Sequence, residues 1–200
     1  MHKNLMHTGL VGLVVMLVLI SGSLCAQERT TFYGGAGIGM PSSPSEFSDY
    51  WKMGFHGSVG IGFPLSPNVR LVPKLEYHSF AFDWGKLGVV GIDGLDMQAL
   101  LIGADVRVAL GVPTASARPY LLGELGMGTI SFSDVTGAGE TIPVGLDETK
   151  MYIGLGGGLE FASSPSTKFF FQFRYISITT SGEATTFIPI TAGVAIGFGG

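Results

Sequence analysis

The chain has 200 residues, a length typical of one domain, and a net charge of -4. Hydrophobic residues make up 46% of it and charged residues 13%, and 32 residues are glycine. This composition is too apolar for a disordered chain and too rich in glycine for a helical bundle, and the mild negative charge argues against a nucleic-acid-binding protein.

The N-terminal segment 1–26 has the layout of a secretory signal peptide. Lys3 gives a short basic start, residues 10–20 form an apolar run, and small polar residues lead to Ala26. The run is shorter than the ~20 residues that a membrane-spanning helix needs. We therefore predict cleavage after Ala26, which leaves residues 27–200 as one domain.

Cys25 is the only cysteine, so an intrachain disulfide is excluded. A lipidated cysteine, as in bacterial lipoproteins, is an alternative, but Leu24 stands where such cysteines have a small residue. We expect Cys25 to be removed with the signal peptide.

Beyond residue 27, apolar residues alternate with small or polar ones, which is the period of a β-strand. YGGAGIGM (33–40) and YIGLGGGLEF (152–161) carry glycines at every second position. This even spacing, with no Lys-Ser/Thr pair behind it, argues against a phosphate-binding loop before a helix. In chain order we predict eight strands, at about 31–40, 53–64, 69–81, 96–110, 119–131, 150–161, 168–178 and 187–198.

The connections between these strands alternate in length, which predicts an asymmetric barrel with long connections on one side and short turns on the other. The short ones contain the turn formers Pro, Asn and Ser and lie at 65–68, 111–118 and 162–167. The longer ones lie at 41–52, 82–95, 131–149 and 179–186.

In each strand, the residues at every second position, which form one parity, are apolar and uncharged. The residues of the other parity are mostly glycines with a few charged side chains. The apolar side chains are too bulky for an eight-stranded interior, and glycines make a poor water-facing surface. The apolar face therefore points into lipid, and the strands close on themselves because open edges leave backbone groups unpaired in hydrocarbon. The predicted fold is all-β: an eight-stranded antiparallel up-and-down transmembrane β-barrel. A secreted soluble barrel that binds an apolar ligand is the competing interpretation.

Aromatic residues near the strand ends predict two interfacial girdles. One would lie beside the short turns and the termini and contain Phe32, Phe63, Phe161, Phe169 and Phe198. The other would lie near the long loops and contain Tyr50, Trp51, Phe55, Trp84, Tyr175 and Phe187.

The last strand ends in TAGVAIGF, with polar Thr191, then Gly193, hydrophobic Ile196 and aromatic Phe198. The chain resembles the small eight-stranded bacterial outer-membrane barrels of the outer membrane protein A/X-like superfamily, whose C-terminal assembly signal has this spacing. Gly199 and Gly200 follow the aromatic residue, whereas members of the family usually end on it. The resemblance implies an outer-membrane location, contact with lipid and lipopolysaccharide, and insertion by the barrel-assembly machinery. We expect a monomer.

The interior parity carries a predicted lumen charge cluster with three positive and four negative members. Buried charges need partners, so we expect a salt-bridged plug. A narrow ion or small-solute channel with a continuous water column is the alternative. The cluster comes from five strands at similar heights and comprises Lys74, Glu76, Asp105, Arg107, Glu124, Glu160 and Arg174.

His56 and Ser58 raise the alternative of an outer-leaflet lipid-modifying enzyme, since lipid A deacylases use a strand-borne His-x-Ser. Here no Asn follows Ser58, and the strand parity points both side chains inward. His78 and Ser79 are adjacent and cannot share a face. No metal-ligand spacing is found, and we predict no metal and no cofactor.

We therefore predict a non-enzymatic barrel that serves envelope integrity or binds a surface partner, as yet unidentified, through its long extracellular loops. These loops are rich in acidic residues, which keep them soluble or, as a weaker alternative, bind divalent cations that bridge to lipopolysaccharide.

The protein should fractionate with the outer membrane and require detergent for extraction, because its outer face is apolar. Its mobility on SDS gels should change on heating. Recovery from the periplasm without detergent, or a mobility insensitive to heating, would contradict the membrane barrel.

Overall fold

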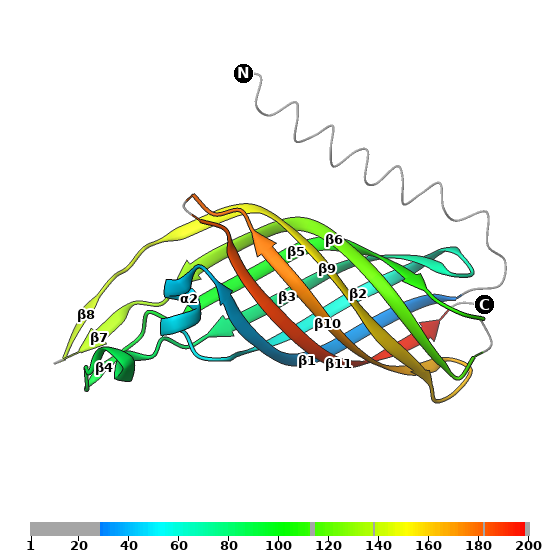
Figure 1. Cartoon of the computed structure of the whole chain (residues 1–200), viewed down its shortest axis with the longest axis horizontal. Coiled ribbons are helices and arrows are strands. Elements are labelled where there is room, and N and C mark those ends of the chain that lie inside the picture. Colours follow the sequence, from blue (N-terminus) through cyan, green and yellow to red (C-terminus); the bar gives the residue numbers. More distant parts are fainter. Residues whose placement is uncertain (1–28, 113–114, 138, 182, 199–200) are drawn as a thin grey trace, which may run out of the picture.

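The computed structural model describes residues 29–112, 115–137, 139–181 and 183–198, and the predicted signal peptide, Cys25 and the last two glycines lie outside these ranges. Eight strands form a closed antiparallel barrel (Figure 1). They are β1 (Thr30–Ser43), β2 (Gly54–Ser66), β3 (Val69–Phe80), β5 (Met97–Ala109), β6 (Ala117–Phe132), β9 (Asp147–Ala162), β10 (Thr167–Ile178) and β11 (Thr185–Phe198). All eight predicted strands and their up-and-down order are confirmed.

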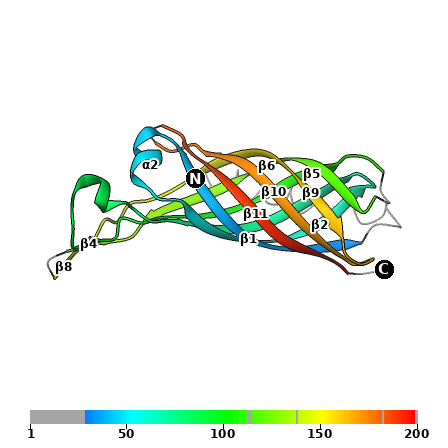
Figure 2. The same ribbon diagram turned by 60° about the horizontal axis from the view of Figure 1, so that its bottom comes forward.

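The barrel closes where the first strand meets the last. β1 pairs with β11 from Thr30, opposite Phe198, to Ser43, opposite Thr186. The start of β1 and the end of β11 therefore lie with the short turns, and the long connections lie at the opposite end (Figure 2).

The long connections contain short elements that the alternation pattern did not predict. They are α2 (Ser45–Tyr50), the 3-10 helix η2 (Trp84–Leu87), β4 (Ile92–Asp93), β7 (Val135–Gly137) and β8 (Glu140–Ile142). β4, β7 and β8 form a separate three-stranded sheet that projects beyond the barrel (Figures 1 and 2). Within the described ranges, no helix has the length and hydropathy required to cross a membrane.

The alternation of exposure along the strands confirms which face points out. On β10, Phe169, Phe171 and Phe173 are 51%, 49% and 58% exposed, whereas Phe170 and Arg174 between or beside them are 4% and 0% exposed. Large apolar side chains are exposed in this way around the whole barrel wall, which indicates that the wall faces lipid and not water.

The glycines on the inner face make room for large side chains from the neighbouring strands. A Cβ atom on Gly156 would lie 2.8 Å from Arg174 Cγ and 2.9 Å from Arg174 Cα. A Cβ atom on Gly158 would lie 2.6 Å from the hydroxyl of Tyr120. The even-spaced glycines of residues 152–161 are thus a strand face packed against lumen side chains.

The prediction of a second aromatic girdle is wrong for Phe187. Phe187 is fully buried inside the barrel. The Trp51 indole donates a hydrogen bond to Leu95 O (3.2 Å), and the Trp84 indole donates one to Gly94 O (3.0 Å). Both tryptophans hold the loop at 81–96 in place, and their membership of the girdle stays a prediction.

Gly156→Ala should lower the free energy of unfolding by about 1–3 kcal/mol, because the added methyl group meets backbone as well as side-chain atoms. Gly57→Ala is the control, since a Cβ there has its nearest neighbour at 3.9 Å. Urea unfolding in detergent micelles, followed by tryptophan fluorescence, measures both. Equal midpoints for the two variants would contradict the close packing.

Candidate functional site

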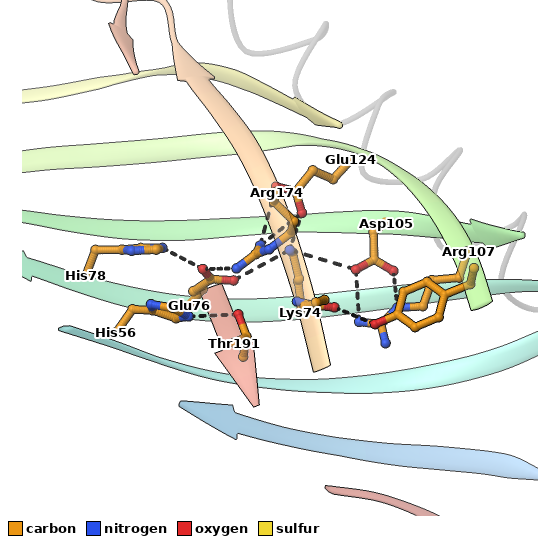
Figure 3. Close-up of polar contacts among 11 residues, drawn as sticks. His56, Lys74, Glu76, His78, Asp105, Arg107, Glu124, Arg174 and Thr191 are labelled. Carbon is orange, nitrogen blue, oxygen red and sulfur yellow. Dashed lines mark hydrogen bonds and ion pairs between the residues drawn. The ribbon is translucent and has the colours of Figure 1, made fainter. Parts of the chain in front are cut away.

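A network of ion pairs crosses the middle of the lumen and joins β3, β5, β6 and β10 (Figure 3). Arg174 Nη2 lies 2.5 Å from Glu76 Oε1, and Arg174 Nη1 lies 3.2 Å from Glu124 Oε2. Lys74 pairs with Glu124, and its Nζ lies 3.5 Å from Glu76 Oε2 and 3.8 Å from Asp105 Oδ2. These contacts bring together residues up to 98 positions apart in the chain.

Arg107 extends the network toward the short turns. Its Nε and Nη2 lie 3.0 and 3.1 Å from the two carboxylate oxygens of Asp105, and its guanidinium carbon lies 4.3 Å from the ring centre of Tyr33. With Arg107 the network holds equal numbers of cations and carboxylates, which compensates the cost of burying them. Its members are Lys74, Arg107 and Arg174 with Glu76, Asp105 and Glu124.

Glu160 does not reach this network, so the expectation that all seven charges lie at similar heights is wrong for it. Its Oε2 lies 3.2 Å from Lys168 Nζ, and its Oε1 accepts a hydrogen bond from the Tyr33 hydroxyl (3.1 Å). Across the sheet it is paired with Arg118, near the short turns. The sequence analysis did not include Lys168 and Arg118 in the lumen cluster. Both lie at the ends of strands, where the alternation does not indicate whether a side chain points into the lumen or outward.

Two histidines lie on the other side of the network. The rings of His56 and His78 stack with centres 4.8 Å apart. His78 Nε2 lies 2.5 Å from Glu76 Oε1, and His56 Nε2 lies 2.9 Å from Thr191 Oγ1 (Figure 3). Both histidines are buried in the lumen, and Ser58 borders a small internal cavity beside Glu76.

Apolar side chains fill the lumen between the histidines and the long loops. Phe47 reaches in from α2, and its ring centre lies 5.3 Å from that of Phe80, which lies 5.3 Å from that of Phe187. The sequence signal for this apolar plug was the presence of apolar residues on the inner parity near the long loops. The plug consists of Phe47, Phe80, Met97, Ala99, Leu101, Ile130, Tyr152, Ile176, Ile178 and Phe187.

The loops outside the plug are tied to one another. Phe82 N donates to Asp96 Oδ1 (3.0 Å), and Asp96 N donates to Ser133 Oγ (2.9 Å). The rings of Trp51 and Phe82 pack edge to face with centres 4.8 Å apart. Three of the long connections therefore form one connected platform.

A cleft of about 490 Å3 opens beside this platform, between β5, β6, β9 and the connection from β10 to β11. Its apolar part is formed by Met97, Ile130, Phe132 and Leu146. Its polar rim contains Asp147, Glu148, Thr180, Ser181 and Thr185. The volume lies in the range of small-molecule sites, ~300–1,000 Å3.

The residues of the predicted assembly signal lie along β11. Thr191 faces the lumen and is buried, and Gly193 lies against the ring of Phe170. Ile196 and Phe198 are exposed on the outer face. Recognition of these residues by the assembly machinery stays a prediction.

Within the described ranges, no group of three or more His, Cys, Asp or Glu side chains could hold a metal ion.

The closed ring of eight strands and its bare apolar wall define a bacterial outer-membrane β-barrel, which confirms the predicted fold class and location. No family model matches the chain, and no curated protein matches it.

Solved structures of the same fold do match. The chain is similar to Neisserial surface protein A, with a TM-score of 0.62 and 19% identity over 84% of this chain and 97% of that chain. It is similar to Ail, the attachment invasion locus protein of Yersinia pestis, with a TM-score of 0.51 and 15% identity over 85% and 100% of the chains. A major outer membrane protein from Thermus thermophilus matches with a TM-score of 0.55 and 12% identity over 86% and 100%. Identities this low establish the shared fold alone.

Arg174→Met should destabilise the barrel by roughly 3–5 kcal/mol, because it leaves Glu76 and Glu124 buried without their guanidinium partner. Urea unfolding in micelles measures the loss. Lys168→Met is the control, since its side chain is 31% exposed at the end of the lumen and should cost much less. Adding Glu76→Gln to Arg174→Met should recover part of the stability; an additive double variant would contradict the coupling.

Proposed function

We propose that this protein is a non-enzymatic surface barrel with a closed lumen that binds a partner outside the cell through its loops. The cleft of about 490 Å3 between the loops carries the proposal. Binding residues often lie on loops that a rigid scaffold holds in place, because loops tolerate changes in sequence that the scaffold does not.

The contents of the lumen support a closed barrel over a channel. The apolar plug lies on the path from the long loops to the ion-pair network, and apart from the Tyr152 hydroxyl its side chains offer water no hydrogen-bond partner. The internal cavity bordered by Ser58, Lys74 and Glu76 has a volume of only about 10 Å3. A continuous water column would require this packing to open.

The position of His56 and Ser58 argues against the lipid-modifying alternative. Both side chains belong to the inner face of β2, and the histidine nitrogen that has a partner contacts Thr191 instead of Ser58. An enzyme acting on outer-leaflet lipid needs its nucleophile on a face that lipid can reach.

The cleft favours a partner that combines an apolar group with positive charge. Leu146 is 62% exposed at its edge, and Asp147 supplies a carboxylate on the rim, where the neighbouring Glu148 is already paired with Lys150 and Ser181. Acidic residues also outnumber basic ones over the loops as a whole, which attracts cationic partners. Because the loops are already held to one another, less conformational entropy is lost on binding.

The same acidic loops support contact with lipopolysaccharide through bridging divalent cations, which would serve envelope integrity. Insertion by the barrel-assembly machinery and a monomeric state complete the proposal.

A dansyl-labelled primary amine, which is both aromatic and cationic, should bind the protein in nanodiscs and show increased fluorescence over empty nanodiscs. Leu146→Ser should weaken this binding about tenfold, because the cleft loses apolar contact area. Ile142→Ser is the matched control: Ile142 is also 62% exposed but lies outside the cleft, on β8.

Equal binding by the two variants would contradict the cleft as the binding site. Mass spectrometry of lipid A from cells with and without the protein tests the enzymatic alternative. An acyl pattern that changes with the protein and is restored by Ser58→Ala would overturn the non-enzymatic proposal.

A further inference from the structure

The end of the lumen near the short turns is basic. Arg70 on β3, Arg107 on β5, Arg118 on β6 and Lys168 on β10 all lie at this end, which faces the periplasm in an outer-membrane barrel. Glu160 lies among them. Arg107 is already balanced by Asp105 in the ion-pair network further inside. The remaining cations of the mouth, Arg70, Arg118 and Lys168, outnumber its one carboxylate, so a positive excess remains here.

A cavity of about 20 Å3 lies between these side chains, next to the turn at residues 67–69. Its polar walls are formed by Asn68, Arg70, Arg107, Arg118, Tyr120 and Glu160. A cavity of this volume has room for about one or two water-sized groups, so it would hold the charged end of a ligand and not a large molecule.

Arg118 lines this cavity and has a hydrogen-bond donor that the described residues do not use. Its Nη2 donates to Asn68 Oδ1 (2.8 Å) and to Pro67 O (3.4 Å), which are neutral acceptors. The residue is only 7% exposed, and its Nε is buried without a hydrogen-bond partner among the described residues. Burying a cationic N–H without an acceptor is costly, and a bound acceptor removes that cost.

Arg107 presents a second such group. Asp105 occupies its Nε and Nη2, while its Nη1 is buried and has no hydrogen-bond partner among the described residues. The residue is 6% exposed and lines the same cavity. Two arginines from different strands, each more than nine-tenths buried, therefore line one small cavity, and each has a donor without a partner among the described residues.

We propose that this mouth is an anion-binding site that takes a single carboxylate or phosphate group presented from the periplasmic side. Guanidinium N–H groups match the oxygens of these anions in geometry and charge. Glu160 also borders the cavity, but Lys168 and Tyr33 already contact its two oxygens. The walls thus keep a net positive charge toward the ligand.

The test uses the mature protein in zwitterionic nanodiscs and follows the arginine Nε–H resonances by NMR during titration with sodium acetate or inorganic phosphate at constant ionic strength. We expect saturable shifts for the Arg118 and Arg107 signals. Arg118→Gln should weaken the response of Arg107 about tenfold, because one charge-assisted hydrogen bond is lost. Arg118→Lys, which keeps the charge but not the fork of donors, should weaken it as well.

Arg29→Gln is the matched control, because Arg29 is exposed at the same end of the barrel and does not line the cavity. It should leave the titration unchanged. Nanodiscs that contain phosphatidylglycerol distinguish the source of the anion: shifts without added salt would assign the site to a lipid headgroup, and shifts only with added ions would assign it to a soluble oxyanion. No saturable shift under any condition, or the same response in Arg118→Gln and Arg29→Gln, would overturn the proposal.

Discussion

Every backbone N–H and C=O group within the hydrocarbon must find its partner in the sheet, and this requirement governs the whole molecule. The pairing of β1 with β11 meets it by closing the ring, which removes both edges. Closure with eight strands leaves an interior only wide enough for side chains. The glycines of β9, the paired charges and the bare outer wall all follow from that narrow interior.

The lumen is arranged in three layers along the barrel axis. The apolar plug lies under the long loops, the balanced ion-pair network lies in the middle, and the basic mouth lies beside the short turns. In the middle layer, the Glu76 carboxylate lies next to two cations, Lys74 and Arg174, and to the His78 ring. The mouth differs, because Arg107 and Arg118 line its cavity and each has a buried donor without a hydrogen-bond partner among the described residues.

The loops are released from the constraint that shapes the barrel, because water can satisfy their backbone groups. They nevertheless form a connected platform through the hydrogen bonds of Asp96 and the indoles of Trp51 and Trp84. The cleft beside this platform departs from simple barrel geometry, and its acidic rim differs from the charge-balanced ion-pair network of the lumen. The proposed partner site therefore lies in the loops, while the paired charges and the apolar plug stabilise the barrel.

The alternation of residues along the chain was enough to predict the eight strands, the face that meets lipid and the identity of most inner charges, because a strand repeats every two residues and bulky apolar side chains cannot fit a narrow interior. Which of those charges meet depends on the closed barrel. Glu160 lies with Lys168 instead of Arg174, since strand tilt and register set its height. The inward direction of Phe187 was not predicted, because near the end of a strand the alternation covers too few residues to specify a face. The pairing of β4, β7 and β8 was not predicted either, because strands of two or three residues show no recognisable alternation.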